Sequence, residues 1–231
     1  MERLSAGVTG IDRMLNGGFP RGYLILLIGE YGTGKTIFSL QYLWKGLELG
    51  EPGVYITLDQ DEEEIIATAG DFGWELEPYI NEEMLAVIRL NPADIKVSIE
   101  RVESELPDLI RRFKTKRLVF DSITLFETLF SDEAERRERI YTLAGLFKGS
   151  GLTTVMTSEG LGGMSLQSRY GFAEYLADGV ISLRYIRQCE MREVSLALEI
   201  VKMRRTAHSR KIMPYSITDK GIVVHTGAEL F

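Results

Sequence analysis

Short apolar runs alternate with amphipathic segments along the first two thirds of the chain. The runs are bounded by charges or turn residues and have the length of buried strands; they are Tyr23–Ile28, Gly53–Leu58, Leu85–Ile88, Arg117–Ser122 and Leu152–Thr157. Between them apolar residues recur at helical spacing, as in Ile37, Leu40, Leu43, Trp44 and Leu47, and again from Glu133 to Lys148. Strands that alternate with helices predict a mainly parallel sheet flanked by helices.

The pattern changes in the last quarter of the chain. Four apolar runs there follow one another with only short polar connections; they are Gly179–Tyr185, Val194–Met203, Lys211–Ile217 and Gly221–Val224. Such a succession predicts an antiparallel β meander at the edge of the parallel sheet. Since no repeat, linker or low-complexity segment interrupts the pattern, we expect residues 1–231 to form a single α/β domain.

Composition narrows the class of protein. No run of about 18 apolar residues suggests a membrane span, and the N-terminus lacks the apolar core of a signal peptide, so we expect a cytoplasmic protein. The single cysteine, Cys189, lies in a polar stretch that we predict to be a hairpin tip, and it excludes an internal disulfide framework. A formal net charge of −7 disfavours a general nucleic-acid binder, because phosphate backbones attract positive surfaces.

One motif carries explicit chemistry. The stretch Gly29–Thr36 fits G-x-x-x-x-G-K-[ST], the phosphate-binding loop or P-loop, and it stands between a predicted strand and a predicted helix. There, backbone amides and the start of the helix face an anion. We therefore predict a nucleotide site, and the predicted binding residues of this stretch are Glu30, Tyr31, Gly32, Thr33, Gly34, Lys35, Thr36 and Ile37. Lys35 would reach the outer phosphates, and Thr36 would offer its hydroxyl to Mg²⁺.

Two acidic positions follow predicted strands. Asp121 ends the strand Arg117–Ser122, where a P-loop protein needs a carboxylate for Mg²⁺, so we predict that Thr36 and Asp121 hold the metal. Asp59 and Gln60 stand at the carboxyl end of the strand Gly53–Leu58, where open α/β sheets place groups that contact the ligand.

Together these motifs make the chain resemble the KaiC-like branch of the RecA/RadA superfamily of ATPases over nearly its whole length. The segments that carry the resemblance are Thr9–Asp12, Gly17–Gly22, the P-loop, Glu51–Tyr55, Phe72–Trp74, Phe120–Ser122, Thr154–Glu159, Arg169–Gly171, Lys202–His208 and Ile217–Gly221. Clock proteins of this family carry two such domains, whereas this chain carries one, so it is similar to the stand-alone relatives.

The resemblance implies a RecA-like P-loop core and a homo-oligomeric ring, usually a hexamer, with ATP and Mg²⁺ bound between neighbouring copies. In the family, a Lys-x-Arg-Gly-Thr-x-His segment reaches the adjacent copy's nucleotide. The residues here that the resemblance assigns to this contact are Lys202, Met203, Arg204, Thr206 and His208. It also places Thr218 and Asp219 near the partner's adenine. The predicted catalytic residues are Lys35, Asp59, Gln60, Lys202 and Arg204.

This chain departs from the family pattern in three places. The family has two consecutive glutamates after its second strand, the first acting as base toward the attacking water, where this chain has Asp59 and Gln60. Aspartate is shorter, and glutamine cannot accept a proton at neutral pH, so we expect slow hydrolysis with binding intact. Arg205 replaces the family's glycine, and Glu30 places an acid inside the P-loop, where we expect it to point outward.

Other functions remain open at this stage. They are a RadA-like DNA-repair accessory, a KaiC-like autokinase, and an ATP-bound scaffold that turns nothing over. The loop expected from Ser122 to Glu135 is acidic and that from Gly160 to Arg169 has one arginine, so DNA binding is disfavoured. Apolar residues after Ser122 would either pack internally, which we expect, or contact an unidentified protein partner; they are Leu125, Phe126, Leu129 and Phe130.

Overall fold

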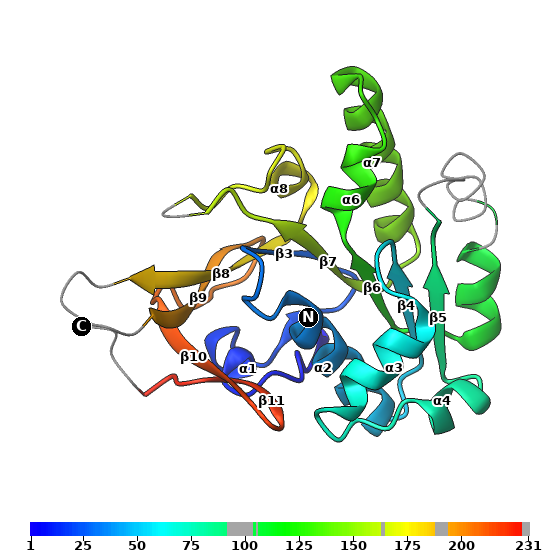
Figure 1. Cartoon of the computed structure of the whole chain (residues 1–231), viewed down its shortest axis with the longest axis horizontal. Helices are drawn as coiled ribbons and strands as arrows, with labels where there is room; N and C mark the ends of the chain where they lie inside the picture. Colours follow the sequence, from blue (N-terminus) through cyan, green and yellow to red (C-terminus); the bar gives the residue numbers. More distant parts are fainter. Residues whose placement is uncertain (92–103, 105, 163–164, 188–193, 228–231) are drawn as a thin grey trace.

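A nine-stranded sheet runs through the structure, a computed structural model that describes residues 1–91, 104, 106–162, 165–187 and 194–227 (Figure 1). Side by side, the strands are β11 (Gly221–Val224), β10 (Met213–Thr218), β9 (Val194–Met203), β8 (Gly179–Arg187), β3 (Leu24–Gly29), β7 (Thr153–Glu159), β6 (Arg117–Asp121), β4 (Gly53–Thr57) and β5 (Leu85–Arg89). The strand that leads into the P-loop, β3, therefore lies inside the sheet, between β8 and β7.

Strand directions divide the sheet into two parts. From β8 to β5 all neighbours pair in parallel, whereas β8–β9, β9–β10 and β10–β11 pair antiparallel. Because the strands from β8 to β5 run parallel, their carboxyl ends share one edge of the sheet. In open α/β sheets this edge binds ligands. We call it the carboxyl-end edge and the opposite one the amino-end edge.

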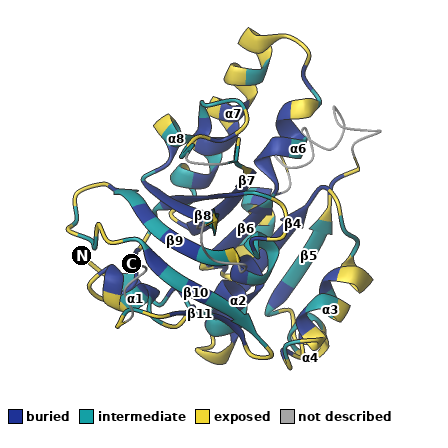
Figure 2. Ribbon diagram, turned by 60° about the vertical axis from the view of Figure 1, so that its left-hand side comes forward, coloured by how far each residue is buried: buried dark blue, intermediate teal, exposed yellow. Residues whose placement is uncertain are grey.

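Helices cover both faces of the sheet (Figure 1). On one face lie α1 (Ile11–Met14), α2 (Lys35–Glu48), α3 (Glu62–Gly70) and α4 (Glu77–Asn81); on the other lie α6 (Ile123–Thr128), α7 (Glu133–Gly149) and α8 (Ala173–Leu176). Side chains alternate along β3, with Ile25 and Leu27 in the first core and Leu26 and Ile28 in the second. Both faces of the strand are thus buried, as Figure 2 shows for the central strands.

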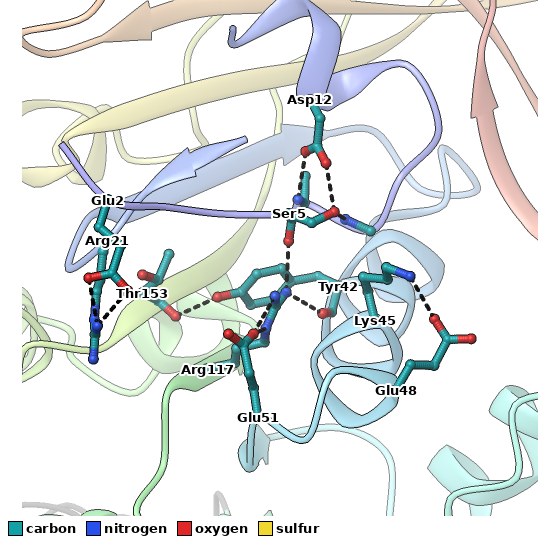
Figure 3. A network of polar contacts seen from close by, with 12 residues as sticks. Glu2, Ser5, Asp12, Arg21, Tyr42, Lys45, Glu48, Glu51, Arg117 and Thr153 are labelled. Atoms are coloured by element: carbon teal, nitrogen blue, oxygen red, sulfur yellow. Dashed lines mark hydrogen bonds and ion pairs between the residues drawn. The ribbon is translucent and has the colours of Figure 1, made fainter. Parts of the chain in front are cut away.

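At the amino-end edge, a polar network fixes the N-terminal segment (Figure 3). Arg117, the first residue of β6, is fully buried and donates to Glu51 Oε2 at 2.8 Å, to Ser5 O at 2.8 Å and to Tyr42 O at 2.9 Å. Its guanidinium also lies over the Tyr42 ring, 4.7 Å from the centroid. A buried charge needs such partners, so Arg117 joins β6, α2 and the N-terminal segment. This segment also forms a two-stranded sheet of β1 (Arg3–Leu4) and β2 (Phe19–Pro20).

The fold class predicted from the sequence is confirmed, with one local difference. The stretch after Ser122 is not simply a loop: Ser122 Oγ accepts a hydrogen bond from Leu125 N and begins α6. Phe126 and Phe130 are buried there in the second core, and Leu125 and Leu129 pack against it, so internal packing is confirmed.

Some predicted features fall outside the described residues. Cys189 and its predicted hairpin tip are among them, and so is part of the amphipathic stretch Ser98–Lys114, of which residues 106–113 are helical. None of the helices within the described ranges is long and apolar enough to cross a membrane.

Candidate functional site

The P-loop connects β3 to α2 at the carboxyl-end edge. Gly32 and Gly34 adopt left-handed φ angles of 72° and 86°, a conformation that glycine takes without a steric penalty. The first-turn amides of any helix lack intrahelical acceptors, and Gly34, the N-cap of α2, has no side chain that could accept from them instead. A Cβ on Gly29 would lie 2.5 Å from Thr33 Oγ1, so the loop closes too tightly for a larger residue. This arrangement of free amides at a helix start fits a phosphate group.

Two tyrosines from the C-terminal meander hold this loop from outside. Tyr215 OH on β10 donates to Thr33 O at 2.6 Å, and Tyr185 OH on β8 donates to Tyr31 O at 3.2 Å. Burial, with a smaller effect of Tyr185, raises the pKa of Tyr215, so its hydroxyl keeps its proton and remains a donor. Neither tyrosine can be recognised from the sequence as a contact of the P-loop, because each bond joins residues more than 150 positions apart.

Lys35 lies inside the loop. Its Nζ donates to Gly29 O and to Glu30 O, each at 3.0 Å. Burial lowers its pKa, and the nearby carboxylates of Asp121 and Glu159 oppose that shift. The Glu30 side chain is directed to the segment after β7, since its Oε2 lies 3.2 Å from where a Cβ on Gly162 would stand. The Lys35 ammonium therefore points into the loop, whereas the Glu30 carboxylate points out of it, toward Gly162.

Asp121 gathers hydroxyl groups from three elements. Its Oδ2 accepts hydrogen bonds from Thr36 Oγ1 at 2.9 Å and from Tyr55 OH at 2.7 Å, and its Oδ1 accepts one from Thr157 Oγ1 at 2.5 Å. Burial, and next the charge of Asp121, raises the pKa of Tyr55, which therefore stays a donor. A carboxylate and a threonine hydroxyl are hard oxygen ligands, so Thr36 and Asp121 fit Mg²⁺ beside a bound triphosphate.

Asp59 and Gln60 follow β4 at the same edge. Thr57 Oγ1 accepts from Asp59 N at 3.2 Å and donates to Gln60 O at 3.1 Å, so the hydroxyl fixes the backbone of both residues. Leu58 N donates to Asp121 O at 3.0 Å, which brings this segment beside the predicted metal ligand. The Asp59 side chain is exposed and Gln60 is half-buried.

The predicted interface cations lie elsewhere. Strand β9 ends at Met203 beside Gly179, the first residue of β8, and Gly179 pairs with Ile25 near the start of β3. The stretch of β3 from Ile25 to Gly29, where the P-loop begins, is about 13 Å long and separates this segment from the P-loop. Within one chain, the structure does not bring Lys202 or Arg204 to the phosphate loop.

Both cations are engaged by their own chain. Lys202 Nζ donates to Ala177 O at 2.7 Å and to Glu174 O at 2.8 Å, and burial, followed by the charge of Arg204, lowers its pKa. Arg204 donates to Tyr175 O at 2.9 Å and pairs with Asp178 at 3.3 Å. Both cations at the amino-end edge therefore already have partners within their own chain.

The other predicted ligand residues divide between the two edges. Thr206 and His208 follow Arg204 at the amino-end edge, and the His208 Nδ1 is buried without a hydrogen-bond partner in the described part of the chain. Met203 is a buried core residue. Thr218 and Asp219 follow Ile217, whose Cδ1 lies 3.0 Å from where a Cβ on Gly34 would stand. In one chain they are therefore on the side of their own P-loop, and their predicted place near a partner's adenine stays a prediction.

The sheet and the loop define a P-loop nucleotide-binding protein with a RecA-like fold. Comparison with known proteins identifies the family within this class. A family model described as "ATPase: KaiC" matches residues 4–229. The circadian clock oscillator protein KaiC of Prochlorococcus marinus is 36% identical over 97% of this chain, and a UPF0273 protein of Pyrococcus horikoshii is 35% identical over 97% of it. The chain belongs to the KaiC family of ATPases.

Coverage distinguishes the relatives. The chain spans 46% of the length of the Prochlorococcus clock protein but 94% of the UPF0273 protein. The crystal structure of a KaiC-like protein from Pyrococcus horikoshii superimposes with a TM-score of 0.86 at 36% identity, covering 97% of this chain and 99% of that one. The resemblance to single-domain KaiC-like proteins is therefore shown over nearly the whole chain.

Proposed function

We propose that this protein binds Mg-ATP between neighbouring copies of itself in a ring, most simply a hexamer, and hydrolyses it slowly. One observation carries the proposal: the phosphate loop and the predicted interface cations lie at opposite edges of one chain's sheet. Two surfaces at opposite ends of a molecule can meet only when copies associate head to tail, and such contacts form rings when the rotation closes.

Each group then has a separate role. Amides from Glu30 to Ile37 and the Lys35 ammonium bind the phosphates, while Thr36 and Asp121 hold Mg²⁺, which neutralises phosphate charge when bound. Lys202 and Arg204 of a neighbouring copy approach the outer phosphate, where a cation supplied in trans is worth about 10³–10⁵ in rate. To reach this phosphate, both side chains must break the hydrogen bonds that they make with their own chain.

Slow hydrolysis follows from the residues after β4. A well-placed general base contributes about 10²–10⁴ to a reaction rate. Asp59 is exposed and one methylene shorter than glutamate, and Gln60 cannot take the proton of water. ATP therefore persists in the site long enough to control assembly, which favours a regulatory or assembly protein in the cytoplasm.

The test is the mass of the protein in solution with and without Mg-ATP, measured by light scattering after size exclusion. We expect a larger, closed species with Mg-ATP for the parent and for Lys45→Ala, whose side chain is on the same helix but pairs with Glu48 at the surface. Lys35→Ala should lose about 10- to 100-fold in ATP affinity and assemble only at correspondingly higher ATP concentration, since hydrogen bonds from a charged donor are lost.

Two results would contradict the proposal. One is a strict monomer at every ATP concentration, which removes the interface. The other is a Lys35→Ala variant that binds ATP as tightly as the parent, which removes the site itself.

A further inference from the structure

The segment 204–209, which includes the predicted interface residues Arg204, Thr206 and His208, is not part of the sheet. It leaves β9 after Met203 and forms turns and extended chain without a strand partner. A segment of this kind keeps one conformation only if other groups hold it. Its position therefore depends on contacts from other elements.

Those contacts come largely from the N-terminal segment, residues 3–23. Four hydrogen bonds join the two segments: Tyr23 OH to Arg204 O at 3.0 Å, Arg3 Nη2 to Thr206 Oγ1 at 2.5 Å, Asn16 Nδ2 to Ala207 O at 3.3 Å, and Ser209 N to Met14 O at 2.8 Å. They are spaced along nearly the whole of 204–209. The N-terminal segment thus fixes this segment at several points rather than at one.

Arg3 makes the one bond among these in which both partners are side chains. Its backbone is held in β1, paired with Pro20, and its Nη1 donates to Gly18 O at 2.7 Å. Because a guanidinium is planar and rigid, fixing one nitrogen on Gly18 also fixes the direction of the other. The other nitrogen bonds to the Thr206 hydroxyl.

We propose that Arg3 is a positioning residue, which fixes Thr206 and with it the segment 204–209 so that this segment can reach the nucleotide of the neighbouring copy. This inference rests on the proposed function, because it needs a site shared between copies. Arg3 lies at the amino-end edge, away from its own P-loop, so its effect is on the adjacent copy's ATP. The bonds from Arg3, Met14, Asn16 and Tyr23 then support the segment that acts in trans.

The first test compares turnover in three variants of the full chain. Arg3→Ala removes both hydrogen bonds and should lower kcat by about 10- to 100-fold, because small displacements of catalytic groups have effects of this size. Arg3→Lys keeps one donor and should fall between Arg3→Ala and the parent. Arg21→Ala is the control: Arg21 belongs to the same N-terminal segment, but it pairs with Glu2 at the surface. It should stay within about twofold of the parent.

A mixing experiment then separates an effect in trans from a purely structural one. Arg3→Ala copies keep an intact P-loop, and Lys35→Ala copies keep an intact 204–209 segment. They are mixed at an ATP concentration at which Lys35→Ala also assembles. In a random equimolar ring, about a quarter of the interfaces combine the two intact parts. We expect each variant to be nearly inactive alone and the mixture to regain turnover at those interfaces.

The outcomes distinguish the inference from the proposed function. If the parent never assembles with Mg-ATP, the proposed function fails and the inference fails with it. If the parent assembles and hydrolyses ATP, but Arg3→Ala matches it or mixing restores no turnover, then Arg3 does not act on the neighbouring copy's ATP. In that case the inference is wrong while the proposed function stands. A thermal melt of Arg3→Ala and Arg21→Ala confirms that folded protein is being compared.

Discussion

The two edges of the central sheet differ in how much of the proposed ATP site each can form alone. At the carboxyl-end edge, the P-loop and Thr36 follow β3, and Asp121 ends β6, two strands that both flank β7. Thr36 and Asp121 already lie within hydrogen-bonding distance. At the amino-end edge, Lys202 and Arg204 are bonded to carbonyls and to Asp178 of their own chain. In the proposed function, the first edge binds the phosphates and the second supplies cations to a neighbouring copy.

This difference between the two edges suggests that ATP binding and ATP turnover can be regulated separately. Binding of ATP needs only the carboxyl-end edge, which is fixed by buried strands and by the tyrosines of the meander. In the proposed function, completing the reaction needs the amino-end edge of a second copy, whose cations must first break the hydrogen bonds they make within their own chain. Occupancy and turnover are therefore separable, and substitutions at the two edges should affect different kinetic constants.

The largest effect is expected at the amino-end edge. Arg204→Ala should lower turnover by about 10³-fold while each copy still binds ATP, because the cation acts on charge that develops in the transition state. ATP affinity by calorimetry and steady-state hydrolysis measure the two separately. Arg210→Ala, an exposed arginine further along the chain, is the matched control. Equal losses of affinity and turnover would show that Arg204 is not separable from the phosphate-binding edge.

A second prediction concerns an acid near each edge. Asp178 is paired with Lys148 and Arg204, whereas Glu127 on α6 is fully buried and neither of its carboxylate oxygens has a hydrogen-bond partner among the described residues. Burial, and next the charge of Glu174, raises the pKa of Glu127 from 4.5 to about 7, with Arg136 opposing the shift. Between pH 4.5 and about 7, Glu127 is therefore mostly protonated in the folded protein and mostly ionised in the unfolded chain.

Stability must therefore fall as the pH rises from about 4.5 to about 7, by at most about 3 kcal/mol from this group. Glu127→Gln, which stays neutral, should lack that part of the pH dependence and gain on the parent above pH 7. Urea unfolding between pH 5 and pH 8 measures the difference, with Glu138→Gln on the exposed side of α7 as control. A parent and a variant with parallel pH profiles would show that Glu127 is ionised throughout.

The third prediction concerns Asp59 and Gln60 at the carboxyl-end edge, which replace the two glutamates that the family has after this strand. Restoring the family's acids with Asp59→Glu and Gln60→Glu together should raise turnover about tenfold, within the range that a general base supplies. Affinity for ATP should change little, since neither side chain belongs to the phosphate loop. Single-turnover hydrolysis measures the gain. An unchanged rate would mean that another group activates water, or that chemistry does not limit turnover.

Features that depend on residues close together in the chain, such as the P-loop and the strands, could be predicted from the sequence. Glycine spacing predicted the loop around Lys35, and apolar runs predicted the strands, so the fold class followed from residues close together in the chain. The hydroxyls of Tyr55 and Thr157 on Asp121, and of Tyr215 on the P-loop, depend on which strands become neighbours. No short-range pattern contains that information. The helix α6 was missed because six residues give too short a period to distinguish from a loop.

Arg205 offers the smallest expected effect and the most direct link between family pattern and backbone geometry. The family has glycine at this position, and Arg205 keeps a left-handed φ of 54°. A side chain there costs about 1 kcal/mol relative to glycine, partly offset because glycine gains more freedom on unfolding. Arg205→Gly should therefore stabilise the protein by about 0.5 kcal/mol, measured by urea unfolding.

The matched control for that measurement is Arg210→Gly, at an exposed position outside the left-handed region, which should instead destabilise slightly. If both substitutions lower stability, the strain at Arg205 is relieved by a contact of its side chain. If Arg205→Gly also lowers ATP turnover while Arg210→Gly does not, its charge contributes to the interface. The amino-end edge of this protein would then supply one cation more than the family pattern contains, and the contrast between the two edges would be sharper here than in its relatives.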